Sequence, residues 1–517
     1  LPQTASGDRS ILDGYLPVIH TAWVDGSLCY EQEAYATWLE GDILNDRMEG
    51  DDPVVAMMRI KVTNRSAGPV EVRLPLTATV DGQGPQKLEA RDGLVYADGP
   101  SATRMCYGID IGAVGELCNG NGEVAYEFSV PSCSAHTFTI KLPFIDLTEQ
   151  EELNRLSALS YDEDRERVIE FWRRRTAEGA QIETPNETLN NFYRTHLMHM
   201  LVINDREPSA DRNVARCGGF HYGSFPDEGC MVIADLDRRG YHAEAERCLD
   251  LYIEYQGTAP LPGNFQSTEG VFYGSGGYEV AGYNRNQGWV LWCLAEHYRL
   301  TRDRAWLERA APALIKGCDW ITRERRATMV IGEGGRRPID YGFLPTGSLE
   351  DVTDYWTWLS TNAYAYQGMC SAADVLAEIG HPEASRLRDD SAAYGDDLRD
   401  GFFEACARSP VVRLRDGTWV PHFPDRLQRR GRDFGWLREV LEGAAHLIYC
   451  GIIAPDEPAA RWIIEDYEDN LFLSKQYGYQ TEDFDRQWFS WGGFSMQPNL
   501  LIFPLIYLAR DEPKHYL

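Results

Sequence analysis

Residues 341–358 read Tyr341-Gly-Phe-Leu-Pro-Thr-Gly-Ser-Leu-Glu350-Asp351-Val-Thr-Asp354-Tyr-Trp356-Thr-Trp358. Glycine and proline mark the first half of this stretch as a loop. Apolar residues recur at helical spacing from Tyr355 onward. The stretch therefore predicts a loop that delivers two adjacent carboxylates, Glu350 and Asp351, to the start of a helix that Asp354 caps.

Two interpretations of these carboxylates are open. Acidic residues are common at a helix start, because the helix dipole favours negative charge there. Carboxylates among aromatic side chains are also what glycoside hydrolysis requires, since desolvation raises the pKa of one carboxyl while the other stays ionised. Trp356 and Trp358 likewise fit either stacking on a sugar ring or packing of the helices. The rest of the chain favours the hydrolytic interpretation.

The composition is that of a soluble protein with more than one domain. No apolar run among the 517 residues reaches the length of a membrane span. The net charge of -30, from 80 acidic and 50 basic residues, argues against nucleic acid or an anionic membrane as a partner. The 12 cysteines are scattered without the spacing of a metal site, which favours free thiols in a reducing, cytoplasmic compartment.

Residues 1–145 alternate apolar and polar positions in short runs separated by turn residues, a pattern typical of an antiparallel β-sandwich. The clearest runs are Leu28–Ala36, Val54–Val62, Val70–Leu76, Tyr126–Val130 and Ser134–Leu142. Residues 146–185 read as charged helices that link this domain to residues 186–517.

Residues 186–517 contain ten predicted helices joined alternately by short and long connections. The helices are expected over residues 188–204, 228–239, 242–256, 286–300, 303–323, 355–379, 382–405, 436–453, 456–472 and 497–509. Long loops inside a compact domain are unusual unless they are functional. The alternation predicts helical hairpins in a ring with the long loops at one mouth. A solenoid is the rival topology, but no fixed sequence period supports it.

Three short motifs follow one another along the chain. They are Phe225-Pro-Asp-Glu228-Gly229 before a helix that ends near Gly240-Tyr241, then Asn284-Arg-Asn-Gln-Gly288-Trp289, then Ser348-Leu-Glu350-Asp351-Val352 between the fifth and sixth predicted helices. In this order they resemble the glucoamylase-like, six-hairpin glycosidases. The resemblance covers nearly the whole chain and implies an N-terminal β-sandwich, a helical linker and an (α/α)6 barrel with glycoside hydrolase activity.

The resemblance also implies roles for the matched residues. Glu350 is then the general acid, and Glu228 takes the aspartate position that binds sugar hydroxyls in the first subsite. Asp227 replaces the arginine of the family and Gln287 stands where the family often has aspartate, which puts glucose specificity in doubt. The expected substrate-binding residues are Phe225, Asp227, Glu228, Asn284, Gln287, Trp356, Trp358 and Trp488.

The general base is expected in the cluster Tyr479-Gln-Thr-Glu482-Asp483-Phe-Asp485. Glu482 could activate a water across the sugar from Glu350, in an inverting reaction that needs no metal or organic cofactor. In the family the base precedes the twelfth helix, whereas this loop precedes only the tenth predicted one. Surface acidity alone also accounts for Glu482, and Asp351 is the other candidate for a catalytic role.

Two further functions fit the same architecture. A disaccharide phosphorylase would use phosphate in place of water, and would need basic side chains such as Arg216 and Arg285 at the mouth of the ring. A non-catalytic glycan-binding protein would keep the fold and lack the base. Fold alone does not separate these functions.

The last predicted helix is apolar nearly all round, which indicates burial between neighbours. A closed six-hairpin ring needs twelve helices, and ten are predicted. We therefore expect a missing C-terminal segment, or a second chain as a partner, to complete the barrel.

Overall fold

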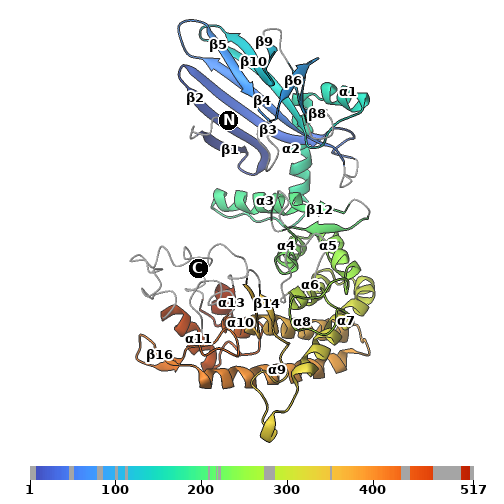
Figure 1. The fold of residues 1–517 in the computed structure, drawn as a ribbon, viewed down its shortest axis with the longest axis vertical. Helices are drawn as coiled ribbons and strands as arrows, with labels where there is room; N and C mark the ends of the chain where they lie inside the picture. The colour runs from blue at the N-terminus through green and yellow to red at the C-terminus, as the bar shows by residue number, and fades with distance from the viewer. Residues whose placement is uncertain are drawn as a thin grey trace. The chain divides into compact units, whose positions relative to one another are not determined.

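The computed structural model divides into two compact units, Leu1–Val202 and Ile203–Leu517, which are described separately here (Figure 1). The residues described are 7–45, 52–78, 86–98, 103–110, 115–207, 210–216, 218, 223–272, 286–349, 352–431, 443–469 and 502–512. Helix α3 (Glu187–Val202) falls in the first unit, whereas the sequence starts the helical domain at residue 186. The predicted domain boundaries stay predictions.

The first unit contains two antiparallel sheets that pack as a sandwich. The larger sheet has the order β1-β2-β3-β4-β11-β8-β7-β6, and the smaller has the order β5-β10-β9. The strands of the larger sheet are β1 (Asp8–Leu12), β2 (Leu16–Asp25), β3 (Leu28–Trp38), β4 (Val54–Asn64), β11 (Ala135–Pro143), β8 (Thr103–Asp110), β7 (Leu94–Asp98) and β6 (Leu88–Arg91). Those of the smaller sheet are β5 (Val70–Leu76), β10 (Glu123–Val130) and β9 (Gly115–Gly120). The predicted N-terminal sandwich is confirmed.

Strand β3 shows how the alternating pattern builds two cores. Successive side chains of a strand point to opposite faces of the sheet. Leu28 and Tyr30 lie on one face and pack with Phe128 of the smaller sheet. Tyr35 lies on the other face and packs with Val168 of helix α2 (Tyr161–Ala177). The larger sheet is therefore covered on one face by the smaller sheet and on the other by helices.

Helices α1 (Gln150–Ala158) and α2 form the predicted charged linker. Ser160 caps α2, because its side chain accepts a hydrogen bond from the backbone N–H of Glu163. Acidic residues in the first turn of α2 and basic residues in its last turn complement the helix dipole. Val168 and Ile169 are buried against the sheet, so the helix is held by its apolar side while its charged side faces outward.

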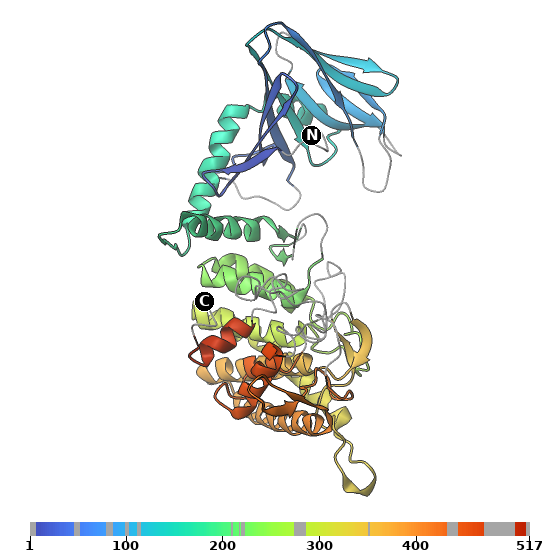
Figure 2. The same cartoon turned by 90° about the vertical axis from the view of Figure 1, so that its left-hand side faces the viewer.

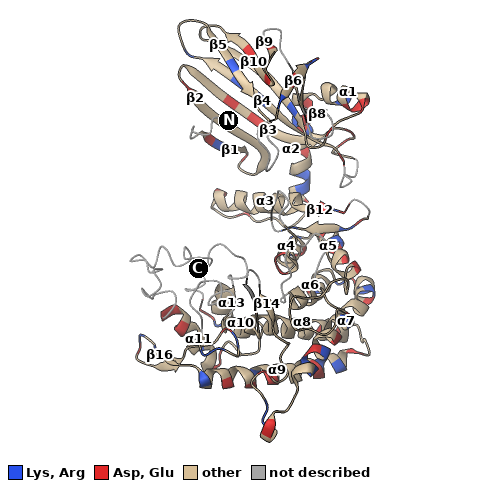
Figure 3. Cartoon of the chain, viewed as in Figure 1, with Lys and Arg blue, Asp and Glu red and all other residues tan. Residues whose placement is uncertain are grey.

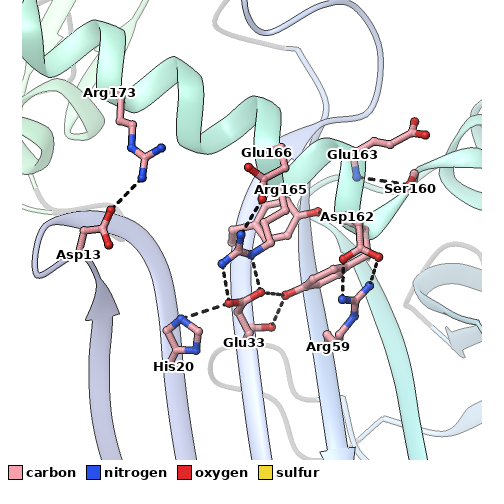
Figure 4. Close-up of polar contacts among 12 residues, drawn as sticks. Asp13, His20, Glu33, Arg59, Ser160, Asp162, Glu163, Arg165, Glu166 and Arg173 are labelled. Atoms are coloured by element: carbon pink, nitrogen blue, oxygen red, sulfur yellow. Dashed lines mark hydrogen bonds and ion pairs between the residues drawn. The ribbon is translucent and has the colours of Figure 1, made fainter.

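A polar cluster joins α2 to strands β2 and β3 (Figure 4). The Glu33 carboxylate accepts two hydrogen bonds from Arg165, of 2.7 and 3.0 Å, and one of 2.9 Å from the Tyr161 hydroxyl. His20 Nε2 lies 3.1 Å from the same carboxylate. Burial by itself raises the pKa of Glu33, but the hydrogen bonds from Arg165 and Tyr161 outweigh it and hold this pKa below its usual value.

Replacing Glu33 with glutamine is expected to lower the free energy of unfolding of the first unit by about 2 kcal/mol at pH 7, because Arg165 loses a charged acceptor. A carboxylate whose pKa is lowered in the folded state stabilises the fold above its unfolded-state pKa. That contribution is lost as the pH falls through the folded-state pKa. Urea unfolding, followed by hydrogen exchange in the sandwich, should therefore show a difference between wild type and Glu33→Gln that shrinks from pH 7 toward pH 3.

The matched control is Asp162→Asn in the same cluster. Arg59 donates hydrogen bonds of 2.6 and 2.9 Å to Asp162, but the Asp162 side chain is 75% exposed. An exposed ion pair contributes at most about 1 kcal/mol. Equal losses for the two variants, or a difference for Glu33→Gln that grows in acid, would contradict the role given to Glu33.

The second unit is built from helical hairpins, and Figure 2 shows its green-to-orange helices lying side by side. The helices are α4 (Pro226–Arg238), α5 (His242–Glu254), α6 (Asn286–Thr301), α7 (Arg304–Thr328), α8 (Leu359–Glu378), α9 (Ala384–Arg408), α10 (Ala445–Tyr449), α11 (Pro458–Tyr467) and α13 (Ile502–Ala509). Residues 239–241, 302–303, 379–383 and 450–457 join the two helices of a pair, and the longer stretches 255–285, 329–358 and 409–444 lead to the next pair. The predicted alternation of short and long connections is confirmed for these pairs.

Short strands and one turn of 3₁₀ helix lie in the connections. They are β12 (Asn204–Arg206) paired with β13 (Asn213–Ala215), β14 (Gly347–Leu349) with β15 (Val352–Trp356), β16 (Val411–Arg413) with β17 (Trp419–Pro421), and η1 (Glu333–Gly335).

Helices α4 and α6 run in the same direction. Near their N-termini, the backbone N–H of Asp227 donates to Asn286 Oδ1 at 3.3 Å. Near their C-termini, His297 Nδ1 lies 2.8 Å from Asp237 Oδ2. The N-terminus of α4 contacts that of α6, and the C-terminus of α4 contacts that of α6. The two helices are therefore parallel.

Helix α8 continues this arrangement beside α6. A side chain at Gly288, in the first turn of α6, would lie 2.2 Å from the carbonyl oxygen of Tyr364, so glycine permits the close approach of the two helices. Toward their C-termini, Arg299 and Asp374 form an ion pair of 3.8 Å. Helices α6 and α8 are therefore also parallel.

Helix α10 follows α8 in the same direction. The Tyr364 hydroxyl lies 3.1 Å from His446 Nδ1, and one turn later Gln367 Oε1 accepts from Cys450 Sγ at 3.8 Å. The four inner helices α4, α6, α8 and α10 thus have their N-termini at one end of the unit. The long connections arrive at that end, as the sequence predicts.

The outer helices close the hairpins and carry the charged surface. Helix α9 is an example: Leu387, Tyr394, Leu398 and Phe402 are buried at helical spacing. Acidic and basic residues alternate along the rest of this helix (Figure 3). An amphipathic outer helix of this kind packs on the inner helices and presents its polar side to water.

The predicted helix over 355–379 starts too early. Residues Val352–Trp356 form strand β15, which pairs with β14, and α8 begins only at Leu359 with Trp358 as its N-cap. Asp354 therefore does not cap the helix. The β-branched and aromatic residues of β15 favour an extended chain, and this local preference overrides the helical periodicity that begins within the strand.

The last predicted helix is present as α13, and only one of its faces is buried. Phe503 and Tyr507 are buried, whereas Leu505 and Leu508 are 44% and 51% exposed. The expectation of burial all round is therefore corrected. The expected C-terminal segment or partner chain stays a prediction, because residues 470–501 lie outside the described residues.

None of the described helices is long and apolar enough to cross a membrane. The ten cysteines whose side chains are described are all free, and six of them are buried.

Candidate active site

The candidate site is the end of the second unit where the inner helices have their N-termini. Six of the predicted residues are described there or nearby: Phe225, Asp227, Glu228, Gln287, Trp356 and Trp358. The other predicted residues, Glu350, Asp351, Glu482, Asn284 and Trp488, lie outside the described residues, and their roles stay predictions.

The first motif forms the start of helix α4. Phe225 is the N-cap and Pro226 is the first helical residue, a position where the missing N–H of proline costs no hydrogen bond. Asp227 is fully buried in the first turn and Glu228 is half-buried beside it. A side chain at Gly229 would lie 2.4 Å from a tyrosine hydroxyl of α5, so the motif needs glycine there. The helix dipole favours both carboxylates at this end.

Gln287, a predicted substrate ligand, makes hydrogen bonds within the protein. Its side chain is fully buried at the start of α6. Its Oε1 accepts from the backbone N–H of Phe272 at 2.8 Å, and its Nε2 donates to the carbonyl oxygens of Gly270 and Gly317 at 3.0 Å each. Both amide donors are therefore engaged within the protein. Gln287 thus connects the loop before α6 to helix α7, and its assignment as a substrate ligand stays a prediction.

The hairpin of β14 and β15 carries the predicted acidic pair. Leu349 pairs with Val352, and Glu350 and Asp351 connect these two residues in the sequence. Trp358 is 1% exposed and its Nε1 donates to the carbonyl oxygen of Gly347 at 3.1 Å. Of the two interpretations of Trp358, the structure favours packing.

Trp356 is half-buried at the end of β15 and packs against Trp358 and Leu349. Between the two tryptophans, Trp356 is therefore the more exposed one.

Asp425 and Arg426 are not among the predicted site residues, and both are fully buried on the connection to α10. The guanidinium carbon of Arg426 lies 4.6 Å from the ring centre of Trp356 and 5.0 Å from that of Trp358. The backbone N–H of Leu359 donates to the carbonyl oxygen of Asp425 at 3.0 Å. A cation in this position is attracted to both rings. Arg426 therefore holds Trp356, the last residue of β15, close to the start of α8.

A signal for this segment is present in the sequence. Phe423-Pro-Asp425 repeats the Phe225-Pro-Asp227 of the first motif, again on the connection that leads to an inner helix. Comparison of the long loops with one another, in place of comparison with a family pattern, would have singled it out.

The structure brings these residues together in two groups. One contains Asp227 and Asn286 at the starts of α4 and α6, and the other contains Trp356, Trp358 and Arg426 around the start of α8. The expected convergence of the first motif with Trp356 in one cleft stays a prediction. Within the described ranges, no group of three or more His, Cys, Asp or Glu side chains could hold a metal ion.

No protein-family model and no curated protein sequence matches the chain. Among solved structures, a bacterial glucoamylase complexed with acarbose superposes with a TM-score of 0.53 at 11% identity, over 88% of this chain and 68% of that chain. The fold is glucoamylase-like. A putative kojibiose phosphorylase from the human microbiome gives a TM-score of 0.41 at 10% identity, over 79% of this chain and 57% of that chain. This second likeness adds nothing to the assignment, because its TM-score is low.

A glucoamylase-like fold accounts for the order of the elements, with a β-sandwich, a helical linker and helical hairpins following one another along the chain. Counted from α3, the acidic hairpin lies between the fifth helix, α7, and the sixth, α8, as the third motif predicts. At 11% identity the likeness supports the fold alone. The roles of individual residues rest on the geometry of this chain.

Proposed function

We propose that the protein is a glycoside hydrolase that cleaves a glycosidic bond of an oligo- or polysaccharide with inversion of the anomeric configuration. The observation that carries this proposal is the common direction of α4, α6, α8 and α10. Because these helices are parallel, the connections in whose sequence the acidic and aromatic motifs stand lead to one end of the unit, which supports the proposal. Carboxylates and aromatic rings are the groups that sugar hydrolysis uses.

In this proposal Glu350 is the general acid and protonates the oxygen of the leaving group. Glu482 is proposed as the general base that takes a proton from water on the opposite face of the sugar. Inverting glycosidases keep two such carboxyl groups about 6.5–9.5 Å apart, which leaves room for the water. Asp351 is the next candidate if either assignment fails.

The proposed substrate-binding residues differ in how exposed their side chains are. Phe225 and Asp227 are buried and support the turn at the start of α4, so direct contact with sugar hydroxyls falls to the half-buried Glu228. Trp356 offers an aromatic surface on which the apolar face of a sugar ring can stack. Contacts of Asn284 and Trp488 with the substrate stay predictions, because both residues lie outside the described residues.

The alternative of a disaccharide phosphorylase needs basic groups to hold phosphate. Arg216, one of the two expected, forms an ion pair with Asp205. Arg285, the other, lies outside the described residues. Phosphate dependence of turnover separates the two reactions directly.

The test is a screen of aryl glycosides and oligosaccharides with the full chain, in buffer with and without inorganic phosphate. Acarbose is the first inhibitor to include, because the glucoamylase of similar fold is complexed with it. Release of sugar without phosphate supports the hydrolase. Turnover only with phosphate would show a phosphorylase, and binding of oligosaccharide without turnover under either condition would show a non-catalytic glycan-binding protein.

A further inference from the structure

Residues 342–348, called here the brace segment, lead into strand β14 and are held by helix α7. Arg325 Nε donates to the carbonyl oxygen of Gly342 at 2.6 Å. One turn later, the hydroxyl of Thr328 lies 2.7 Å from the carbonyl oxygen of Phe343 and 2.8 Å from that of Arg325, and it shares its one proton between them. Both donors come from the last turn of helix α7, which therefore supports this end of the brace segment.

The other end of the brace segment is held by the connection before α6. The backbone N–H of Asn264 donates to the carbonyl oxygen of Thr346 at 2.8 Å, and its side-chain amide donates to the Thr346 hydroxyl at 2.7 Å. The backbone N–H of Ser348 donates to the carbonyl oxygen of Pro262 at 2.9 Å. The segment is thus tied to neighbouring parts of the unit along most of its length.

Asn362, in the first turn of helix α8, bonds to the chain before the hairpin of β14 and β15 and to the N-cap of its own helix after it. Its Oδ1 accepts from the backbone N–H of Leu344, before β14, at 2.9 Å, and its Nδ2 donates to the carbonyl oxygen of Trp358, after β15, at 2.7 Å. The hydroxyl of Tyr394 donates to the same Oδ1 at 2.7 Å and so fixes the orientation of the amide. The Asn362 side chain is 1% exposed, which makes each of these bonds costly to lose.

We propose that Asn362 is a positioning residue for Glu350 and Asp351, because its bond to Leu344 ties the segment that precedes these carboxylates to helix α8, which follows them. The proposal rests on the proposed function, in which Glu350 donates the proton. Placement of a proton donor matters steeply, since a misplacement of about 1 Å can cost a factor of about 10² in rate. The alternative is that Asn362 only satisfies the buried N–H of Leu344, which would affect stability and leave the chemistry alone.

The leaving group separates these two roles. A dinitrophenolate leaves without protonation, whereas the alcohol of a natural oligosaccharide needs the general acid. Asn362→Leu removes all three hydrogen bonds at nearly constant volume. It is expected to lower kcat/KM for the oligosaccharide by about 10–100-fold, and to change kcat/KM for the dinitrophenyl glycoside of the same sugar by less than about threefold.

Tyr394→Phe is the matched control, because it removes one bond to Asn362 and leaves the bonds to Leu344 and Trp358 in place. The selective loss on the oligosaccharide should be much smaller in Tyr394→Phe than in Asn362→Leu. Hydrogen exchange adds a readout that needs no substrate: peptides covering residues 342–358 should lose protection in Asn362→Leu and keep it in Tyr394→Phe. If Asn362→Leu does not fold, Thr328→Val serves in its place, because it removes the hydrogen bond to the Phe343 carbonyl oxygen. It should also lower kcat/KM for the oligosaccharide more than for the dinitrophenyl glycoside, by a smaller factor.

Three results are decisive. Equal losses on both glycosides, or unchanged exchange over residues 342–358 in Asn362→Leu, would overturn the positioning role and leave the proposed function standing. A Glu350→Gln variant without selective loss on the oligosaccharide would overturn the assignment of the acid instead. A selective loss in both Glu350→Gln and Asn362→Leu supports the two together.

Discussion

Replacing Glu350 with glutamine is expected to lower kcat for a natural oligosaccharide by about 10²–10⁴, the usual contribution of a general acid. The amide keeps the shape of the side chain but does not supply the proton that the leaving oxygen needs. Thermal unfolding should stay close to that of the wild type, since the change adds and removes no volume. Steady-state kinetics on the best substrate from the screen, together with a melting curve, provides the measurement.

Asp351→Asn is the control for this prediction, because it removes the neighbouring carboxylate of the same hairpin. If Glu350 is the acid, Asp351→Asn should retain turnover to within about tenfold, since its charge only modulates the neighbouring group. Near wild-type activity in Glu350→Gln with a large loss in Asp351→Asn would exchange the two assignments. Near wild-type activity in both would remove the acidic hairpin from the mechanism.

Replacing Arg325 with methionine is expected to destabilise the second unit by about 3 kcal/mol, because it leaves the poorly exposed Asp397 with only the exposed Arg337, among the described residues, beside it and removes the hydrogen-bond donor to the Gly342 carbonyl oxygen. Arg325 is 2% exposed, and its Nη2 donates to Asp397 Oδ2 at 2.9 Å. Burial lowers the pKa of Arg325 and raises that of Asp397, so desolvation outweighs the attraction within the pair. The cost of the substitution therefore includes both the weakened pairing of Asp397 and the lost hydrogen bond to Gly342.

The same carboxylate provides the control. Arg337 also approaches Asp397, at 3.4 Å, but its side chain is 59% exposed, and Arg337→Met should cost less than about 1 kcal/mol. Adding Asp397→Asn to Arg325→Met should restore part of the lost stability, because the weakly paired charge is then removed. Urea unfolding of the three variants measures this. Equal losses for the two arginines, or no recovery in the double variant, would contradict the account.

The architecture was predictable because it depends on regular local patterns. The alternation in Val54–Val62 and Val70–Leu76 identifies β4 and β5, and the alternation of short and long connections identifies the helical pairs. The start of α8 was missed because the helical periodicity runs back into residues that pair with Gly347–Leu349. Hydrophobic periodicity does not reveal that two segments pair across a turn. The periodicity therefore predicts a helix where the structure has strand β15.

The candidate site was predictable only in part. The first motif identifies the start of α4, since proline, acidic residues and glycine each have a local reason to be there. The structural role of Gln287 was not predictable, because its partners come from a distant loop and another helix. Arg426 and Asn362 were missed for the same reason: each acts through contacts with segments that folding alone brings near.

The central claim is hydrolysis with inversion, and proton NMR of the first product tests it most directly. The wild-type chain is mixed with its best oligosaccharide substrate in phosphate-free buffer, and the anomeric proton of the new reducing end is followed before mutarotation. The account predicts that this proton first appears with the configuration opposite to that of the bond cleaved. Appearance with the same configuration, or product only after phosphate is added, would contradict it.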